Sequence, residues 1–152
     1  MGTEFESEKS IGLASDHAGY RLKAYLEARL TDWGYRVVDF GAYSDDSVDY
    51  PDFAHRLGNA IDGNELKMGV AVCSSGNGIN IALNRHVNVR AAICWNEELA
   101  ALAREHNDAN VCTFPARYLD GEQAEKILKI FISTGFSEDD RHRRRINKIN
   151  LL

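Results

Sequence analysis

A cysteine followed by a run of small residues is the part of this sequence best suited to chemistry. Cys73 ends an apolar run that begins at Met68. The five residues that follow it are small or suited to tight turns: Ser74, Ser75, Gly76, Asn77 and Gly78. Ile79, Ala82 and Leu83 then have the spacing of an amphipathic helix. A strand, a glycine-rich turn and a helix in this order place backbone N–H groups around an anion.

A thiol at the lip of such a turn is favoured as the thiolate, which can accept a proton from a bound molecule. We therefore predict that Cys73 is a general base. The alternative is that it packs as a small apolar side chain, which is the usual fate of an unpaired cysteine. We adopt that alternative for Cys94 and Cys112, because no glycine-rich turn follows either of them.

Two histidine-containing segments are the next candidates. Asp16 and His17 follow the first predicted strand, where Asp16 could simply cap a helix and His17 could donate to a phosphate or sugar oxygen. His106 and Asn107 end a predicted helix, where a histidine also interacts favourably with the helix dipole. That helix runs back to the amino end of the sheet, away from Cys73. If His106 is catalytic, we therefore expect it to serve the site of a neighbouring subunit.

Arginines supply candidate contacts to an anion. Arg141 and Arg145 lie four residues apart in a basic segment, so in a helix they share a face and could hold a phosphate bidentately. A solvated charged surface is the alternative. Ile146 and Ile149 form an apolar stripe that could dock this helix. Arg117 follows the last predicted strand, on the same side of the sheet as Cys73.

Apolar runs alternate with helical patterns along the chain. Strands are expected at 9–15, 35–40, 68–73, 89–94 and 110–114, and helices at about 22–33, 51–61, 79–83, 97–105, 122–132 and 138–152. This order predicts a three-layer α/β/α Rossmann-like fold with a five-stranded parallel sheet and an extra C-terminal helix. Ligands of such sheets bind beyond the carboxyl ends of the strands. We expect strands 9–15 and 68–73 to be neighbours, so that Asp16, His17 and Cys73 face one crevice.

Size and composition limit the possible functions. The chain has 152 residues and a formal net charge of −5, which suits a single domain at 9–152 and disfavours a general nucleic-acid binder. Residues 1–8 are polar and are expected to be a disordered start or an expression scar. The odd number of cysteines, without metal-type spacing, predicts a reduced cytoplasmic protein with no metal site, and no apolar run suggests a membrane span.

Six segments together resemble the B-type ribose-5-phosphate isomerases and the related galactose-6-phosphate isomerases. They are SDHAG at 15–19, DYPDFA at 49–54, CSSGNGINIALNR at 73–85, NVRAAIC at 88–94, REHNDANV at 104–111 and RHRRRI at 141–146. Their order is that of the family, and they extend over nearly the whole chain. The resemblance implies interconversion of ribose 5-phosphate and ribulose 5-phosphate without a metal or organic cofactor.

The resemblance also implies roles for individual residues. Cys73 would remove the C2 proton to give a cis-enediolate, Ser75 would polarise the reacting oxygens, and His106 would assist opening of the furanose ring. The N–H groups of residues 74–78 would stabilise the developing negative charge. Substrate contacts are implied for Asp16, His17, Ser74, Ser75, Gly76, Asn77, Gly78, Asn107, Arg117, Arg141 and Arg145. Relatives are dimers or tetramers whose sites are shared between subunits, which agrees with the expected position of His106.

Some positions depart from the common pattern of the family. Ser74 stands where glycine is frequent, Ser75 where threonine is frequent, and Asn77 where many relatives have valine. Because all parts of the site occur in one chain, we expect a homo-oligomer that acts on a pentose phosphate. Allose 6-phosphate or galactose 6-phosphate is an alternative substrate. A noncatalytic sugar-phosphate sensor, which would not need Cys73 or His106, is the alternative from another class.

Overall fold

Five parallel strands form one sheet in the computed structural model, which describes residues 9–151; the predicted disordered start at 1–8 lies outside the described residues. The strands are β1 (Ser10–Ser15), β2 (Arg36–Asp39), β3 (Gly69–Cys73), β4 (Ala91–Ile93) and β5 (Val111–Pro115), in the spatial order β2-β1-β3-β5-β4. The expected pairing of the first and third strands is confirmed, because Ser15 lies opposite Val72.

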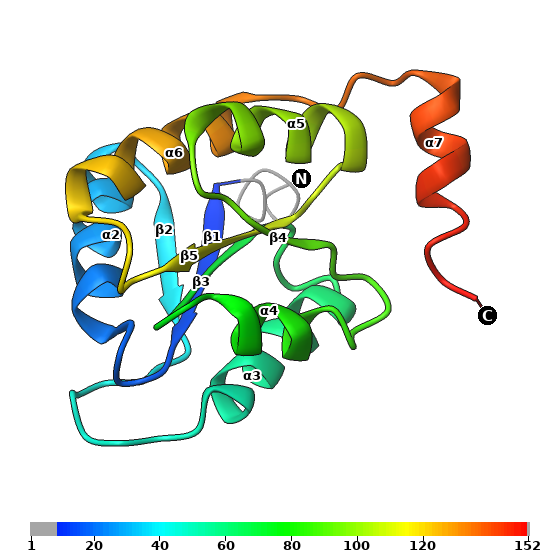
Figure 1. The fold of residues 1–152 in the computed structure, drawn as a ribbon. Coiled ribbons are helices and arrows are strands. Elements are labelled where there is room, and N and C mark those ends of the chain that lie inside the picture. Colours follow the sequence, from blue (N-terminus) through cyan, green and yellow to red (C-terminus); the bar gives the residue numbers. More distant parts are fainter. Residues whose placement is uncertain (1–8, 152) are drawn as a thin grey trace.

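Helices cover both faces of the sheet (Figure 1). They are α2 (Tyr20–Asp32), α3 (Tyr50–Asp62), α4 (Asn77–Leu83), α5 (Glu97–Asn107), α6 (Gly121–Ser133) and α7 (Asp140–Ile146). Helices α2, α5 and α6 pack their apolar stripes on one face, and α3 and α4 pack theirs on the other. The predicted three-layer α/β/α architecture is therefore confirmed.

The alternation of side chains along β3 explains why Cys73 faces a helical layer. Val70 and Val72 belong to the core that α2, α5 and α6 cover, whereas Ala71 and Cys73 belong to the core that α3 and α4 cover. Successive residues of a strand point to opposite faces, so a strand buried on both sides has an uninterrupted apolar sequence. The Cys73 thiol consequently lies on the α4 side of the sheet, beside the turn that begins α4.

The C-terminal helix is shorter than the sequence predicts. A helix at 138–152 was expected, but α7 ends at Ile146, and Ile149 is 55% exposed instead of docking. Asp139 begins the helix, since its carboxylate accepts the Arg141 N–H at 3.0 Å. In the part that forms, His142 is buried and Ile146, four residues later, is half-buried. The inward face of α7 therefore carries a histidine, which the expected isoleucine stripe did not include.

None of the helices within residues 9–151 combines the length and apolar character that crossing a bilayer would require.

Candidate active site

Three adjacent strands deliver candidate residues to one edge of the sheet. Parallel pairing sets Cys73, the last residue of β3, opposite Pro115 of β5, and β1 ends beside β3 on the other side. The pairing continues past the strand ends, because the Arg117 N–H donates to the Ser74 carbonyl at 3.0 Å. Asp16, Cys73 and Arg117 therefore leave the sheet side by side at its carboxyl edge, as expected for ligand sites in parallel sheets.

The turn after β1 fixes the Asp16 carboxylate. Asp16 is 7% exposed, and its Oδ1 accepts the Gly19 N–H at 3.0 Å. Gly19 is the N-cap residue of α2, so Asp16 stabilises the preceding turn instead of occupying the cap position itself. A Cβ at residue 19 would lie 2.4 Å from the Val72 carbonyl oxygen. Only glycine allows this turn to approach β3 so closely, and that approach brings Asp16 towards the end of β3.

A loop contact sets the tautomer of His17. The Val48 N–H donates to Nδ1 of His17 at 3.2 Å, so a neutral imidazole carries its proton on Nε2. The loop that supplies Val48 is held to β1, since the Ala42 N–H donates to the Ser15 carbonyl at 2.7 Å. The arrangement gives His17 a donor suited to a phosphate or hydroxyl oxygen.

A buried ion pair stabilises the beginning of this loop. Nζ of Lys23 donates to Oδ1 of Asp39 at 2.5 Å and to the Ala42 carbonyl at 2.6 Å. Lys23 is only 1% exposed, and a buried ammonium group is stable only when its donors are matched in this way. Sequence reasoning did not identify this lysine, because its residue type and helical position are also typical of a solvated side chain.

The turn after Cys73 has the tight geometry that its composition predicts. Gly76 has φ = +79°, a left-handed conformation that favours glycine, and it is the N-cap residue of α4. Ser74 and Ser75 are half-buried and Asn77 is exposed. Oγ of Ser75 accepts the Asn77 N–H at 3.2 Å, so this N–H already has a partner. Cys73 itself is 4% exposed, at the base of the turn.

The other two cysteines have a different environment. Cys94 and Cys112 are fully buried, on the sheet face opposite Cys73. Burial raises the pKa of the Cys112 thiol well above its usual value, and the neighbouring Cys94 raises it further. Cys112 therefore stays protonated and packs as an apolar group, in agreement with the prediction for both residues.

His106 and Asn107 lie at the opposite edge of the sheet from Cys73. They end α5, and three residues later the Asn110 carbonyl accepts the N–H of Gly69, the first residue of β3. Cys73 is the last residue of β3, so the full strand, roughly 13 Å at about 3.3 Å per residue, separates the two edges. The candidate residues therefore fall into two groups at opposite edges of the sheet. The carboxyl-edge group contains Asp16, His17, Cys73, Ser74, Ser75, Gly76, Asn77, Gly78 and Arg117.

The second group, which we call the α5–α7 group, consists of His106, Asn107, Arg141 and Arg145. Helix α7 stands beside the end of α5, apart from the three layers (Figure 1). The rings of His106 and His142 lie with their centroids 4.3 Å apart, and Nδ1 of His142 is 2.9 Å from Oγ of Ser137. Arg141 and Arg145 are exposed. The contact between the two histidines therefore brings the arginines of α7 to the same side of the molecule as His106.

Sequence reasoning missed His142, although a signal existed. The segment RHRRR was interpreted only as a source of cationic side chains, whereas His142 and Ile146 have the i, i+4 spacing of an inward face. The structure places one aromatic ring among several cations at this position.

The docking of α7 should weaken as the pH falls below about 6.5, the ordinary value for histidine. Burial lowers the pKa of His142, the positive charges of His106, Arg141 and Arg145 lower it further, and Asp139 opposes them. Below that pH the unfolded chain binds a proton that the folded chain does not, so stability decreases with acidification. Thermal unfolding of the wild type should show this decrease between pH 7.5 and 5.5, and His142→Asn should reduce it. An equal decrease in both proteins would contradict the prediction.

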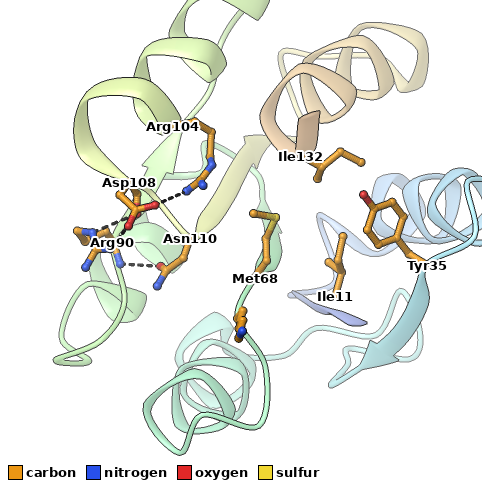
Figure 2. A pocket seen from close by; sticks show the side chains of 9 residues that line it. Ile11, Tyr35, Met68, Arg90, Arg104, Asp108, Asn110 and Ile132 are labelled. Atoms are coloured by element: carbon orange, nitrogen blue, oxygen red, sulfur yellow. Dashed lines mark hydrogen bonds and ion pairs between the residues drawn. The ribbon is translucent and has the colours of Figure 1, made fainter. Parts of the chain in front are cut away.

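A cavity of about 390 Å³ lies at the amino edge of the sheet (Figure 2). None of the predicted site residues lines it. Its walls combine apolar side chains with a cluster of charged ones, among them Arg90, Arg104 and Asp108. Within residues 9–151 no group of three or more His, Cys, Asp or Glu side chains is arranged to hold a metal ion.

Comparison with known proteins identifies the family to which this chain is similar. The model of the family described as "Ribose/Galactose Isomerase" matches residues 11–149 of this chain. Ribose-5-phosphate isomerase B of Escherichia coli K12 is 35% identical over 144 residues, which cover 95% of this chain and 96% of the relative.

Solved structures agree with this match. The crystal structure of a ribose 5-phosphate isomerase from Thermotoga maritima has a TM-score of 0.91 at 43% identity, covering 94% of this chain and 98% of the other. Ribose-5-phosphate isomerase B from Mycoplasma genitalium, solved with bound ribulose-5-phosphate, has a TM-score of 0.87 at 37% identity, covering 92% and 93%. The chain therefore belongs to the ribose/galactose isomerase family.

Proposed function

We propose that this protein is an aldose–ketose isomerase that interconverts D-ribose 5-phosphate and D-ribulose 5-phosphate. The observation that carries the proposal is the position of Cys73 between Asp16 and Arg117 at the carboxyl edge, in a chain of this family. The relatives named ribose-5-phosphate isomerase B, one of them solved with ribulose-5-phosphate, support the choice of substrate. The reaction belongs to the non-oxidative part of pentose phosphate metabolism.

In the proposed mechanism Cys73 acts as the base. Its thiolate removes the proton from C2 of the open-chain aldose, and the electron pair of that C–H bond forms the C1–C2 double bond of a cis-enediolate. A proton also moves from O2 to O1 in this intermediate, and return of the first proton to C1, with the carbonyl now at C2, gives the ketose. The redistribution of two electrons occurs within the substrate, so the balance needs no external oxidant, reductant or organic cofactor.

The turn after Cys73 would stabilise the charge that develops on the substrate oxygens. Ser75 is the proposed polarising hydroxyl, assisted by the backbone N–H groups of Ser74, Ser75, Gly76 and Gly78. Because the Asn77 N–H already donates to Ser75 Oγ, we assign it to orienting that hydroxyl instead of binding substrate directly. The half-buried position of Ser75 supports this role, since a partly desolvated donor interacts more strongly with an anion.

The proposed substrate contacts extend along the sugar to its phosphate. The fixed carboxylate of Asp16 accepts from sugar hydroxyl groups, and His17 donates to an oxygen of the sugar phosphate. Asn107 contributes an amide from the α5–α7 group. Guanidinium groups bind phosphate in bidentate geometry, and three of them are assigned to the phosphate end: Arg117, Arg141 and Arg145.

Separation of the two groups supports a site shared between subunits. Cys73 and His106 lie at opposite edges of the sheet in one chain, so a single chain cannot apply both to one sugar. We therefore propose a homo-oligomer, a dimer or tetramer, in which the α5–α7 group of one subunit completes the carboxyl-edge group of another. His106 would donate a proton to the ring oxygen of the furanose and so open it. A cytoplasmic location fits the three unpaired cysteines and is part of the proposal.

Initial rates on three sugar phosphates test the function. Ribose 5-phosphate should be turned over with a higher kcat/KM than allose 6-phosphate or galactose 6-phosphate, measured side by side with the untagged oligomer. A higher kcat/KM for either hexose phosphate would replace the pentose by a six-carbon substrate. Binding of all three without turnover would instead favour a sugar-phosphate sensor.

A further inference from the structure

Arg90, the residue before β4, lies beside Asp108 and donates hydrogen bonds to the backbone at the end of α5 (Figure 2). Its Nε donates to the carbonyl oxygens of Asn107 and Asp108, at 3.0 and 3.1 Å. Its Nη2 donates to the Asp108 carbonyl at 2.9 Å and to Oδ2 of Asp108 at 3.2 Å. One guanidinium group therefore satisfies carbonyl groups that the end of a helix leaves without partners.

Arg104 holds Asp108 from the other side. Its Nη1 donates to Oδ1 of Asp108 at 2.9 Å and to the Ala109 carbonyl, while its Nε donates to the Thr134 carbonyl at 3.1 Å. Asp108 has φ = +45°, a left-handed conformation that residues other than glycine seldom adopt. The two arginines thus fix a residue whose backbone would otherwise prefer another conformation, and with it the direction in which α5 ends.

The base of Arg90 is itself fixed to the sheet. Its N–H donates to Oδ1 of Asn110 at 2.8 Å, and its carbonyl accepts the Asn110 N–H at 2.9 Å. Asn110 in turn pairs with Gly69 at the start of β3. A continuous set of hydrogen bonds therefore runs from the central strand through Arg90 to the Asn107 carbonyl, one residue after His106.

We propose that Arg90 is a positioning residue for His106 and Asn107, with Arg104 and Asp108 completing the support. The inference rests on the proposed function, in which those two residues act on the sugar in a partner subunit. Arg90 acts through its hold on the helix end, because its donors are directed at carbonyl groups of its own chain. A misplacement of a reacting group by about 1 Å can reduce the rate of an enzyme by as much as about 100-fold.

Arg90→Lys is the first test, because it keeps the charge but replaces a planar fork by a single ammonium group. We expect kcat/KM for ribose 5-phosphate to fall about tenfold or more. In the same variant, solvent deuterium should still enter C1 of ribulose 5-phosphate at a near wild-type rate at saturating substrate. That exchange needs Cys73 and an open-chain ketose, whereas turnover of the aldose also needs His106 to open the ring.

Arg36→Lys is the matched control, because Arg36 is exposed and begins β2 at the same amino edge; its kcat/KM should equal that of the wild type. Arg90→Ala adds a second readout. The cavity of about 390 Å³ beside Arg90 should admit guanidinium ion at millimolar concentration and restore part of the lost turnover.

Each outcome either supports or contradicts the positioning role of Arg90. Wild-type kcat/KM in Arg90→Lys would overturn the inference while leaving the proposed function intact. Equal losses of turnover and of C1 exchange would also overturn it, since they would indicate general damage to the site. If the wild type neither turns over ribose 5-phosphate nor exchanges the C1 proton, the proposed function fails and the inference fails with it. A selective loss of turnover, with rescue of Arg90→Ala, supports it.

Discussion

Replacement of Cys73 by serine should reduce kcat on ribose 5-phosphate about a thousandfold, the scale of a lost general base. The hydroxyl group occupies nearly the same space at the end of β3, so the turn at 74–78 and its N–H groups should stay in place. An alcohol is a much weaker acid than a thiol, so a serine hydroxyl supplies essentially no anion at neutral pH that could take the C2 proton. Affinity for ribulose 5-phosphate, measured by isothermal titration, should therefore change little.

Proton exchange distinguishes loss of the base from other defects. Cys73→Ser should fail to incorporate deuterium at C1 of ribulose 5-phosphate, because no enediolate forms. Cys112→Ala is the control, since its sulfur is fully buried on the other face of the sheet; that variant should keep both exchange and turnover. If Cys73→Ser continued to exchange at the wild-type rate, the base would have to be another group at the carboxyl edge.

The positions of the central strands were predictable because each of these strands is buried on both faces. β1, β3 and β5 consist almost entirely of buried residues, so their sequences are apolar runs bounded by turns. Parallel pairing then follows from the helices between them. The adjacency of Asp16 and Cys73 was accessible to the same reasoning, because it depends on topology and not on side-chain detail.

Contacts that depend on backbone carbonyl groups were not predictable. The hold of Arg90 on Asn107 and Asp108 joins residues 17 and 18 positions apart, and any sequence of residues supplies the accepting carbonyl groups. The end of α7 at Ile146 also escaped prediction, because helical spacing continued to Ile149 while no packing surface continued with it. In both cases the deciding interaction is tertiary and leaves no pattern of residue types in the sequence.

A mixture of two inactive proteins should be active. Cys73→Ser and His106→Asn should each have little turnover alone. In dimers reassembled from equal amounts after mild dissociation, turnover should recover to about a quarter of the wild-type value. Half of the dimers are then mixed, and a shared site in a two-fold symmetric dimer leaves one of their two sites with both native residues. Mixing Cys73→Ser with the double variant that carries both substitutions should restore nothing.

The recovery of turnover depends on where the carboxyl-edge group and the α5–α7 group lie in one chain. In one chain β3 separates the edge that bears Cys73 from the edge where α5 ends, and α7 packs beside that end of α5 through the contact between His142 and His106. If both residues served a site within one chain, every site in the mixture would lack one of them and no turnover would return. Recovery can therefore come only from sites built across the boundary between subunits, and its absence after verified subunit exchange would show that Cys73 and His106 do not act together in a site shared between subunits.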